Sequence, residues 1–243
     1  MEKVVVVAFA SDAAAPLVDD EVVRLNERLL DALDSVRYPD LGLQVEDNEA
    51  TLRWQRRKRP LARRLRLSLS VWTECGDDVS ELVAALGPLA DDHAAFVVTE
   101  AVPRWEAARP VSATGPSPGV TVTSLLCRNP AMTHDEFVAH WRDVHQPMSL
   151  RIHPQRTYVR NVVARTLTAE TVPIDAVCEE GFASLDDVLD PARFFGADTS
   201  GRSWKENAGV IGADVGLFLD TAHTTATIMR DHRLRSFRSR PQR

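Results

Sequence analysis

The strongest constraint on the fold is an order of strand and helix patterns that occurs twice along the chain. In the first half, a buried strand pattern at residues 3–10 precedes apolar residues at helical spacing over residues 18–33. Apolar residues at 65–71 then alternate with Arg, Ser and Trp, the period-two pattern of a half-buried strand. Weaker patterns predict a strand over 42–54 with a turn near 47–48, a helix over 77–90 and a strand over 95–102. The resulting order is β-α-β-β-α-β, the split βαβ arrangement.

The second half repeats this order after a linker rich in Pro and Gly at residues 110–119. The elements expected there are strands at 120–127, 157–164, 176–183 and 224–230, a helix at 133–146, a short helical stretch at 185–195, and a loop rich in Gly and polar residues before the last strand. The first strands of the two halves lie about 117 residues apart. We therefore predict an α+β chain of two tandem ferredoxin-like halves, 1–109 and 120–232, with a basic tail at 233–243. The halves are expected to bury their open sheet faces against each other.

The overall charge argues against nucleic acid as the main partner. The 243 residues carry a formal net charge of −6, whereas phosphate binding needs a positive surface. One basic run, residues 56–66, departs from this balance. Its simpler interpretation is a solvated loop and strand edge, where positive charge discourages edge-to-edge pairing. An anionic partner such as RNA is the alternative.

The cysteines and the apolar segments predict a cytoplasmic protein that does not enter membranes. Cys75, Cys127 and Cys178 are odd in number and widely spaced, so they suggest no disulfide framework, and a reducing compartment is expected. The apolar run near the first residue has the pattern of a strand rather than of a signal peptide. No stretch approaches the ~18 apolar residues of a membrane span.

The most specific signal lies in residues 132–147, MTHDEFVAHWRDVHQP. Thr133 and Glu136 have the spacing of a capping box, which predicts that a helix begins here. Pro147 disfavours helical backbone at Gln146, so the helix is expected to stop or kink there. The residues that fall on one apolar stripe of this helix are Phe137, Trp141, Val144 and Met148.

Two histidines flank this stripe on opposite borders. His140 and His145 are five residues apart, which in an α-helix places their side chains about 140° apart. A ligand above the stripe would meet a histidine, and His145, in the last helical turn, is placed to titrate near neutral pH. The simpler interpretation of either residue is a packed histidine with one hydrogen bond. A metal site is not expected, because helical pairs that chelate one ion are spaced three or four residues apart.

The string Phe137-x-x-His140-Trp141-x-x-x-His145-x-Pro147 resembles the signature of the EthD family, small ferredoxin-like proteins of the dimeric α/β-barrel superfamily. The resemblance covers the second half, whereas the first half matches in element order only. It implies a barrel that is closed within one chain by one active and one structural half. Relatives include cofactor-free decarboxylases and dehydratases of aromatic polyketides, with a histidine as acid/base. The superfamily also includes oxygenases, cyclases and haem enzymes, and fold alone does not choose among them.

Two strands of the second half add candidates for the site. Tyr158 would either donate a hydrogen bond to an oxyanion or phenolate, or simply reach water. Glu180 shares a strand face with Cys178 and Phe182, while Glu179 points to the opposite face. Burial between apolar groups would raise the pKa of Glu180, which would then orient a histidine or act as a base itself.

We predict a cofactor-independent lyase-type enzyme, a dehydratase, decarboxylase or cyclase, that acts on a small aromatic or polyketide-like molecule. His145 would be the general acid/base, while His140 and Tyr158 would polarise a carbonyl or phenol. The substrate-binding residues would be Phe137, Trp141, Glu180 and Phe182. The main alternative is a small-molecule-binding or accessory protein without chemistry, and a haem enzyme is a further one. Both a monomer and a homodimer are compatible with tandem halves.

Overall fold

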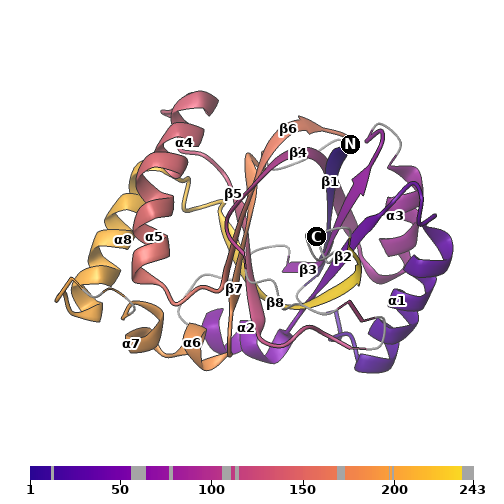
Figure 1. Ribbon diagram of the computed structural model, residues 1–243, viewed down its shortest axis with the longest axis horizontal. Helices are drawn as coiled ribbons and strands as arrows, with labels where there is room; N and C mark the ends of the chain where they lie inside the picture. Colours follow the sequence, from indigo (N-terminus) through magenta and orange to yellow (C-terminus); the bar gives the residue numbers. More distant parts are fainter. Residues whose placement is uncertain are drawn as a thin grey trace, which may run out of the picture.

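The computed structural model describes most of the chain. The described residues are 1–11, 14–55, 64–76, 79–105, 111–112, 115–168, 173–196, 198 and 200–236. Within them, eight antiparallel strands close into one barrel, with helices packed on two opposite sides (Figure 1). The strands are β1 (Glu2–Ala10), β2 (Asp40–Glu46), β3 (Arg64–Thr73), β4 (Asp92–Arg104), β5 (Val120–Leu126), β6 (Thr157–Thr166), β7 (Ala176–Phe182) and β8 (Thr225–Arg235).

The strand order shows how the two halves share the barrel. The first half contributes neighbouring strands in the order β4-β1-β3-β2, and the second half contributes β8-β5-β7-β6 in the equivalent order. Antiparallel pairs β2–β8 and β4–β6 join the halves and close the sheet. Closure removes the exposed sheet edges that otherwise promote aggregation. The chain therefore has an α+β fold with an eight-stranded antiparallel barrel, and a second copy is not needed to close it.

Helices cover the barrel on two sides. The helical elements are α1 (Asp19–Ala32), α2 (Asn48–Gln55), α3 (Ser80–Leu86), η1 (Gly87–Leu89), α4 (His134–His140), η2 (Trp141–His145), α5 (Gln146–Ile152), α6 (Asp186–Leu189), α7 (Pro191–Phe194) and α8 (Trp204–Phe218). In Figure 1, α1 and α3 lie on one side of the barrel, and α4, α5 and α8 lie on the other. The helix α2, from the first half, packs against strands and helices of the second half. No helix in the described part of the chain combines the length and apolar composition that a membrane span requires.

Strand β1 buries both of its faces. On β1, Val4 and Val6 pack outward against apolar residues of α1 and α3, while Val5 and Val7 point into the barrel. Their lumen neighbours come from other strands and include Phe96. These side chains fill one end of the barrel with an apolar core, and Lys3, one alternation earlier, faces the polar end.

Two expectations from the sequence are corrected by helices. The strand expected over 42–54 ends at Glu46, and α2 follows, because the Asp47 carboxylate caps the helix by accepting a hydrogen bond from the Ala50 N–H at 3.1 Å. The loop expected before the last strand is instead the 15-residue helix α8. Three glycines in it reduce helix propensity, but a capping box of Ser203 and Glu206 starts the helix.

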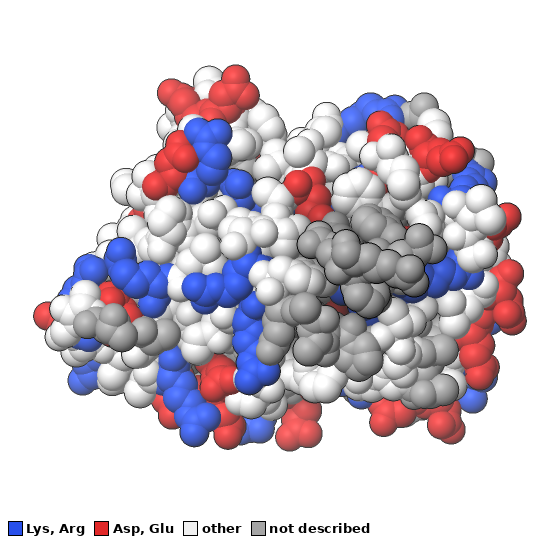
Figure 2. Space-filling view, in the orientation of Figure 1, with Lys and Arg blue, Asp and Glu red and all other residues white. Residues whose placement is uncertain are grey.

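The last strand is longer than expected. β8 runs to Arg235 and pairs there with β2, so the first three residues of the predicted basic tail belong to the barrel. Residues 237–243 lie outside the described residues. Most of the basic run, 56–63, also lies outside them, but Arg64 is buried and its Nε donates to Glu46 Oε2 at 2.7 Å. Figure 2 shows acidic and basic side chains interspersed on the face in view.

Two buried histidines predict a loss of stability in mild acid. Burial lowers the pKa values of His153 and His232 to about 4. Both are neutral in the folded chain at pH 7, and His232 Nδ1 lies 3.1 Å from Asn26 Nδ2, the donor. The unfolded chain binds protons as the pH falls below about 6.5, before the folded chain does, so the free energy of unfolding decreases from there and levels off below about 4.

The expected loss is up to about 3 kcal/mol for each histidine, measured by urea denaturation across this pH range. His232→Gln keeps a hydrogen-bond acceptor near Asn26 and removes the titration. This variant is expected to show a weaker pH dependence than the natural chain. An unchanged pH dependence would contradict the assignment for His232.

Candidate functional site

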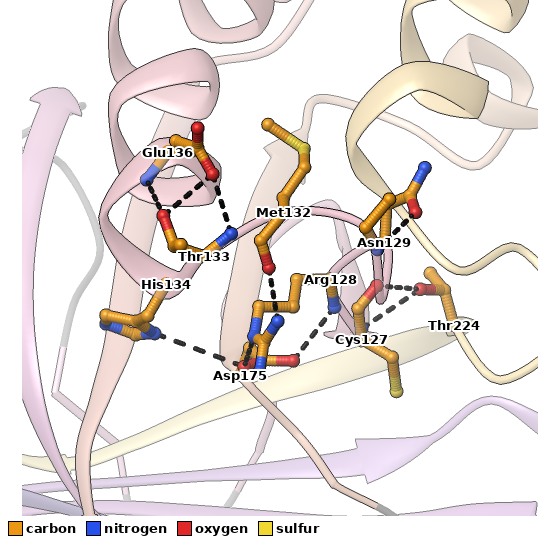
Figure 3. Close-up of polar contacts among 10 residues, drawn as sticks. Cys127, Arg128, Asn129, Met132, Thr133, His134, Glu136, Asp175 and Thr224 are labelled. Atoms are coloured by element: carbon orange, nitrogen blue, oxygen red, sulfur yellow. Dashed lines mark hydrogen bonds and ion pairs between the residues drawn. The ribbon is translucent and has the colours of Figure 1, made fainter.

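Figure 3 shows how the start of α4 is fixed to the barrel. The predicted capping box is confirmed: Thr133 Oγ1 accepts from the Glu136 N–H at 3.3 Å, and Glu136 Oε2 accepts from the Thr133 N–H at 2.8 Å. Just before it, Arg128 Nε donates to Asp175 Oδ1 at 3.1 Å and NH1 donates to the Met132 carbonyl. These contacts therefore hold the start of the helix that carries both histidines in place against the barrel.

Of the two outcomes expected from Pro147, a stop or a kink, the stop does not occur, because the helix continues past Gln146. It widens into the π-helical turn η2, closed by the Gln146 N–H donating to the carbonyl of Trp141, and then continues as α5 with Pro147 at its start. The wider turn relieves the clash that a proline ring makes with the carbonyl four residues earlier. The turn also changes which residues face inward, so Val144, expected on the buried stripe, is 43% exposed.

The same π turn brings the two histidines to one carboxylate. In a turn closed by i→i+5 hydrogen bonds, residues five apart lie above one another rather than on opposite borders. His140 Nε2 lies 2.8 Å from Asp214 Oδ1, and His145 Nδ1 lies 2.7 Å from Asp214 Oδ2. Asp214 comes from α8, so two helices meet at this cluster.

Packing and charge hold the cluster in place. The ring of Phe218, one turn further along α8, contacts both imidazoles, with ring centroids 5.0 Å from His140 and 4.9 Å from His145. Burial alone would raise the pKa of Asp214, but the hydrogen bonds from His145 and His140 outweigh it and lower that pKa. Asp214 is therefore an anion that accepts one N–H from each ring. The histidine side chains are 19% and 14% exposed, so solvent reaches them.

A buried carboxyl lies on the barrel side of His145. Glu180 on β7 accepts hydrogen bonds from Ser149 Oγ at 3.3 Å and from Gln155 Nε2. Burial raises the pKa of Glu180, although the charge of His145 and these hydrogen bonds pull it down. Environments that lower the pKa of Asp214 and raise that of Glu180 on either side of one imidazole are typical of acid/base sites.

The comparisons with known proteins concern the segment that contains this cluster. Residues 129–222, which contain the two histidines, the carboxylate and Glu180, match the family model of the EthD domain. The second half of this chain is therefore similar to the EthD domain over these residues. No curated protein matches the sequence.

Solved structures show a similar fold. An anthrone oxidase-like protein aligns over 100% of this chain and 96% of its own, with a TM-score of 0.61 and 9% identity. A protein from Lactobacillus acidophilus NCFM described as a "putative monooxygenase" aligns over 97% and 98%, with a TM-score of 0.49 and 8% identity. The first of these likenesses supports a barrel of the dimeric α/β type.

The large aromatic residues expected at the site in the second half of the chain are buried. Phe137 and Trp141 are both 0% exposed, and their ring centroids lie 5.8 Å apart. Trp141 Nε1 donates to the hydroxyl of Tyr158 at 2.9 Å beneath the helix. Burial raises the pKa of Tyr158 well above its usual value, so it is a neutral phenol. Tyr158 therefore holds Trp141 here, and its expected contact with a substrate carbonyl requires the helix to move.

Two other candidates lie apart from the histidines. Phe182 belongs to an apolar cluster with Val120 and Val188, and its ring centroid lies 5.6 Å from that of Phe194. Cys178 is buried beneath α4, where burial raises the pKa of its thiol. Its surroundings match the expected small buried hydrophobe rather than a nucleophile.

Asp214 is the member of this cluster that sequence reasoning missed. It stands 69 residues after His145, in a segment expected to be a loop. The available signal was the Ser203-x-x-Glu206 capping box, which places a helix where Asp214 and Phe218 share one face.

The described residues do not form a ready-made metal site. Among the described residues, no group of three or more His, Cys, Asp or Glu side chains is arranged to hold one. The two imidazole nitrogens nearest Asp214 are already engaged with its oxygens. Function without a cofactor stays a prediction.

Proposed function

We propose that this chain is a cofactor-independent lyase-type enzyme that dehydrates, decarboxylates or cyclises a small aromatic or polyketide-like molecule. The observation that carries the proposal is the carboxylate of Asp214 shared by His140 and His145. A shared carboxylate orients two imidazoles at once and stabilises a positive charge that forms on either of them.

The geometry gives His145 the role of general base. An ionised carboxylate only accepts hydrogen bonds, so His145 Nδ1 carries the proton that binds Asp214. In the neutral form of this ring, Nε2 carries no proton and can take one from substrate. The raised pKa of Glu180 suits a neutral acid that returns a proton to the leaving group.

The remaining residues position these groups. His140 holds the second oxygen of Asp214, and its other ring nitrogen is the group that we assign to polarise a substrate carbonyl or phenol. Phe137 and Trp141 keep the helix on the barrel, with Tyr158 beneath them. We assign Phe182, in the apolar cluster with Val120 and Val188, to contact with the apolar part of a substrate along β7.

The substrate class rests on two supports. The first is the resemblance to the EthD family, which implies aromatic polyketide substrates, and the second is the neighbour with the TM-score of 0.61, described as anthrone oxidase-like. Phe218, stacked against both histidines, offers an aromatic neighbour for such a molecule. We further propose a cytoplasmic protein without nucleic-acid partners, and tandem ferredoxin-like halves, which the equivalent strand orders support.

The test is product analysis with a panel of anthrones and hydroxylated polyketide aldehydes or acids. Mass spectrometry is expected to find loss of water or of carbon dioxide without added metal, flavin or haem. Oxygen incorporation under air would replace the lyase by an oxygenase at the same site. Unchanged recovery of a tightly bound panel member would support the binding-protein alternative instead.

One observation favours that alternative, a small-molecule-binding or accessory protein. Phe137 and Trp141 are fully buried, so the helix and barrel are closed around the aromatic residues that would contact a substrate. A binding protein would open this face to admit a ligand and close again without chemistry.

A further inference from the structure

A buried arginine lies against the helix that carries the histidines. Arg160 on β6 is 8% exposed, and its guanidinium carbon lies 5.5 Å from the centroid of the Trp141 ring. The Nε atom of Arg160 is buried and has no hydrogen-bond partner. Within the residues that the structure describes, no carboxylate forms an ion pair with this guanidinium, so a cation–π contact with the indole ring is what holds it.

The acidic side chain closest in charge effect to Arg160 is already paired elsewhere. Asp143 accepts hydrogen bonds from Arg142 through both oxygens, at 2.7 Å from Nε and 2.6 Å from NH2. Tyr158 and Cys178, which also neighbour Arg160, are neutral because burial raises both of their pKa values. Burial lowers the pKa of Arg160, and the charge of Arg142 acts in the same direction. Arginine keeps its proton at neutral pH, so Arg160 is a buried cation without compensation.

The chemistry of this cation indicates the group that it binds. Buried charges in proteins are normally paired, and an unpaired one requires an explanation such as a ligand. The planar guanidinium matches the two oxygens of a carboxylate and binds them through two parallel hydrogen bonds. One uncompensated cation balances one negative charge, which favours a carboxylate over a doubly charged phosphate.

We propose that Arg160 binds the carboxylate of an acidic aromatic substrate. The inference rests on the proposed function, because it names the substrate class of that site. Trp141 connects the two parts of the site: its ring contacts Arg160, and His145 lies one turn further along the same helix. A carboxylate held at Arg160 fixes the orientation of the substrate ring relative to the base.

The bound carboxylate is not the group that reacts. Decarboxylation would break its bond to carbon and leave the electron pair on carbon, whereas pairing with a guanidinium stabilises the carboxylate and raises the barrier to this step. In a dehydration, His145 takes a proton from carbon and Glu180 gives a proton to the departing hydroxyl, so water leaves and the carboxylate stays in place. We therefore expect the product to retain this acid group.

The test is a titration of the full chain with sodium benzoate, followed by NMR through the indole N–H of Trp141. This N–H donates to Tyr158, two residues before Arg160 on β6. A saturable shift is expected. Benzamide, which has the same ring without the charge, and sodium chloride at equal ionic strength are the matched probes. Neither is expected to reproduce the shift.

Substitutions of Arg160 locate the site. Arg160→Met removes the charge, keeps a long unbranched side chain against Trp141 and is expected to weaken benzoate binding at least about tenfold. Its thermal unfolding midpoint is expected to stay level or rise, because an uncompensated buried charge is removed. Arg160→Lys keeps the charge without the planar fork and is expected to have an intermediate affinity. Arg24→Met, at an exposed position of α1, makes the same change of charge and is the control with unchanged affinity.

Three results would overturn the proposal: no saturable shift in the natural chain, an equal response to benzamide, or unchanged benzoate affinity in Arg160→Met. The probe comparison uses the natural chain, so it decides the matter even where a variant folds poorly.

Turnover is measured separately, so that the two proposals fail in different ways. Equal kcat/KM for acid substrates and their uncharged analogues would support the lyase and contradict the role of Arg160. Benzoate binding that requires Arg160, without turnover of any panel member, would support the carboxylate site in a binding protein.

Discussion

Replacement of His145 by alanine is expected to lower kcat/KM by about 10²–10⁴ on any substrate that the chain converts. The loss follows from removal of the Nε2 base, whose orientation depends on the 2.7 Å contact between Nδ1 and Asp214. The thermal unfolding midpoint is expected to stay within a few degrees, because His145 is partly exposed and lies at the edge of the aromatic core.

His223 supplies a matched control for this variant. Its Nδ1 also lies 2.7 Å from a carboxylate, Asp220, but the pair is exposed and sits in a turn before β8. His223→Ala is expected to leave turnover unchanged. Equal losses in the two variants would place His145 among structural histidines, and so would loss of the fold in His145→Ala.

Replacement of Asp214 by asparagine is expected to reduce kcat/KM by a similar factor, about 10²–10⁴. His140 and His145 bind different oxygens of Asp214, and an amide replaces one of these oxygens by an NH2 donor, so one imidazole loses its acceptor. Loss of the negative charge also removes the partner that stabilises an imidazolium at either ring. The unprotonated base then persists to lower pH, so the acidic limb of the kcat/KM profile is expected to move to lower pH.

The pH profile separates positioning from simple structural damage. A variant that only loosened α8 would lose activity without moving that limb. Asp220→Asn, which removes the carboxylate of the exposed pair, is the control and is expected to keep both the rate and the profile. An acidic limb that stays in place in Asp214→Asn would contradict the role assigned to this carboxylate.

The local features of the site were predictable because neighbouring residues determine them. The capping box at Thr133 and the opposite faces of Glu179 and Glu180 depend on positions within three residues of each other. The two strand-and-helix series likewise follow from local periodicity. These patterns were sufficient to place both histidines beside an apolar helix face.

The remaining features depend on contacts between distant segments. The π turn inserts one residue into a helix, and a proline signal alone does not distinguish a widened turn from a helix end. Asp214 meets the histidines only because α8 packs against the turn. Inside the barrel, Glu179 on β7 likewise contacts Lys3 on β1 and Gln44 on β2. Only closure of the barrel brings these three strands together.

The most direct test of the central claim is the tautomer of His145, measured by nitrogen-15 NMR on the natural chain at neutral pH. The shared-carboxylate arrangement predicts a proton on Nδ1, held by Asp214, and an unprotonated Nε2. Asp214→Asn is expected to shift both His140 and His145 signals. A proton on Nε2 with Nδ1 free, or histidine signals that do not respond to Asp214→Asn, would contradict the account.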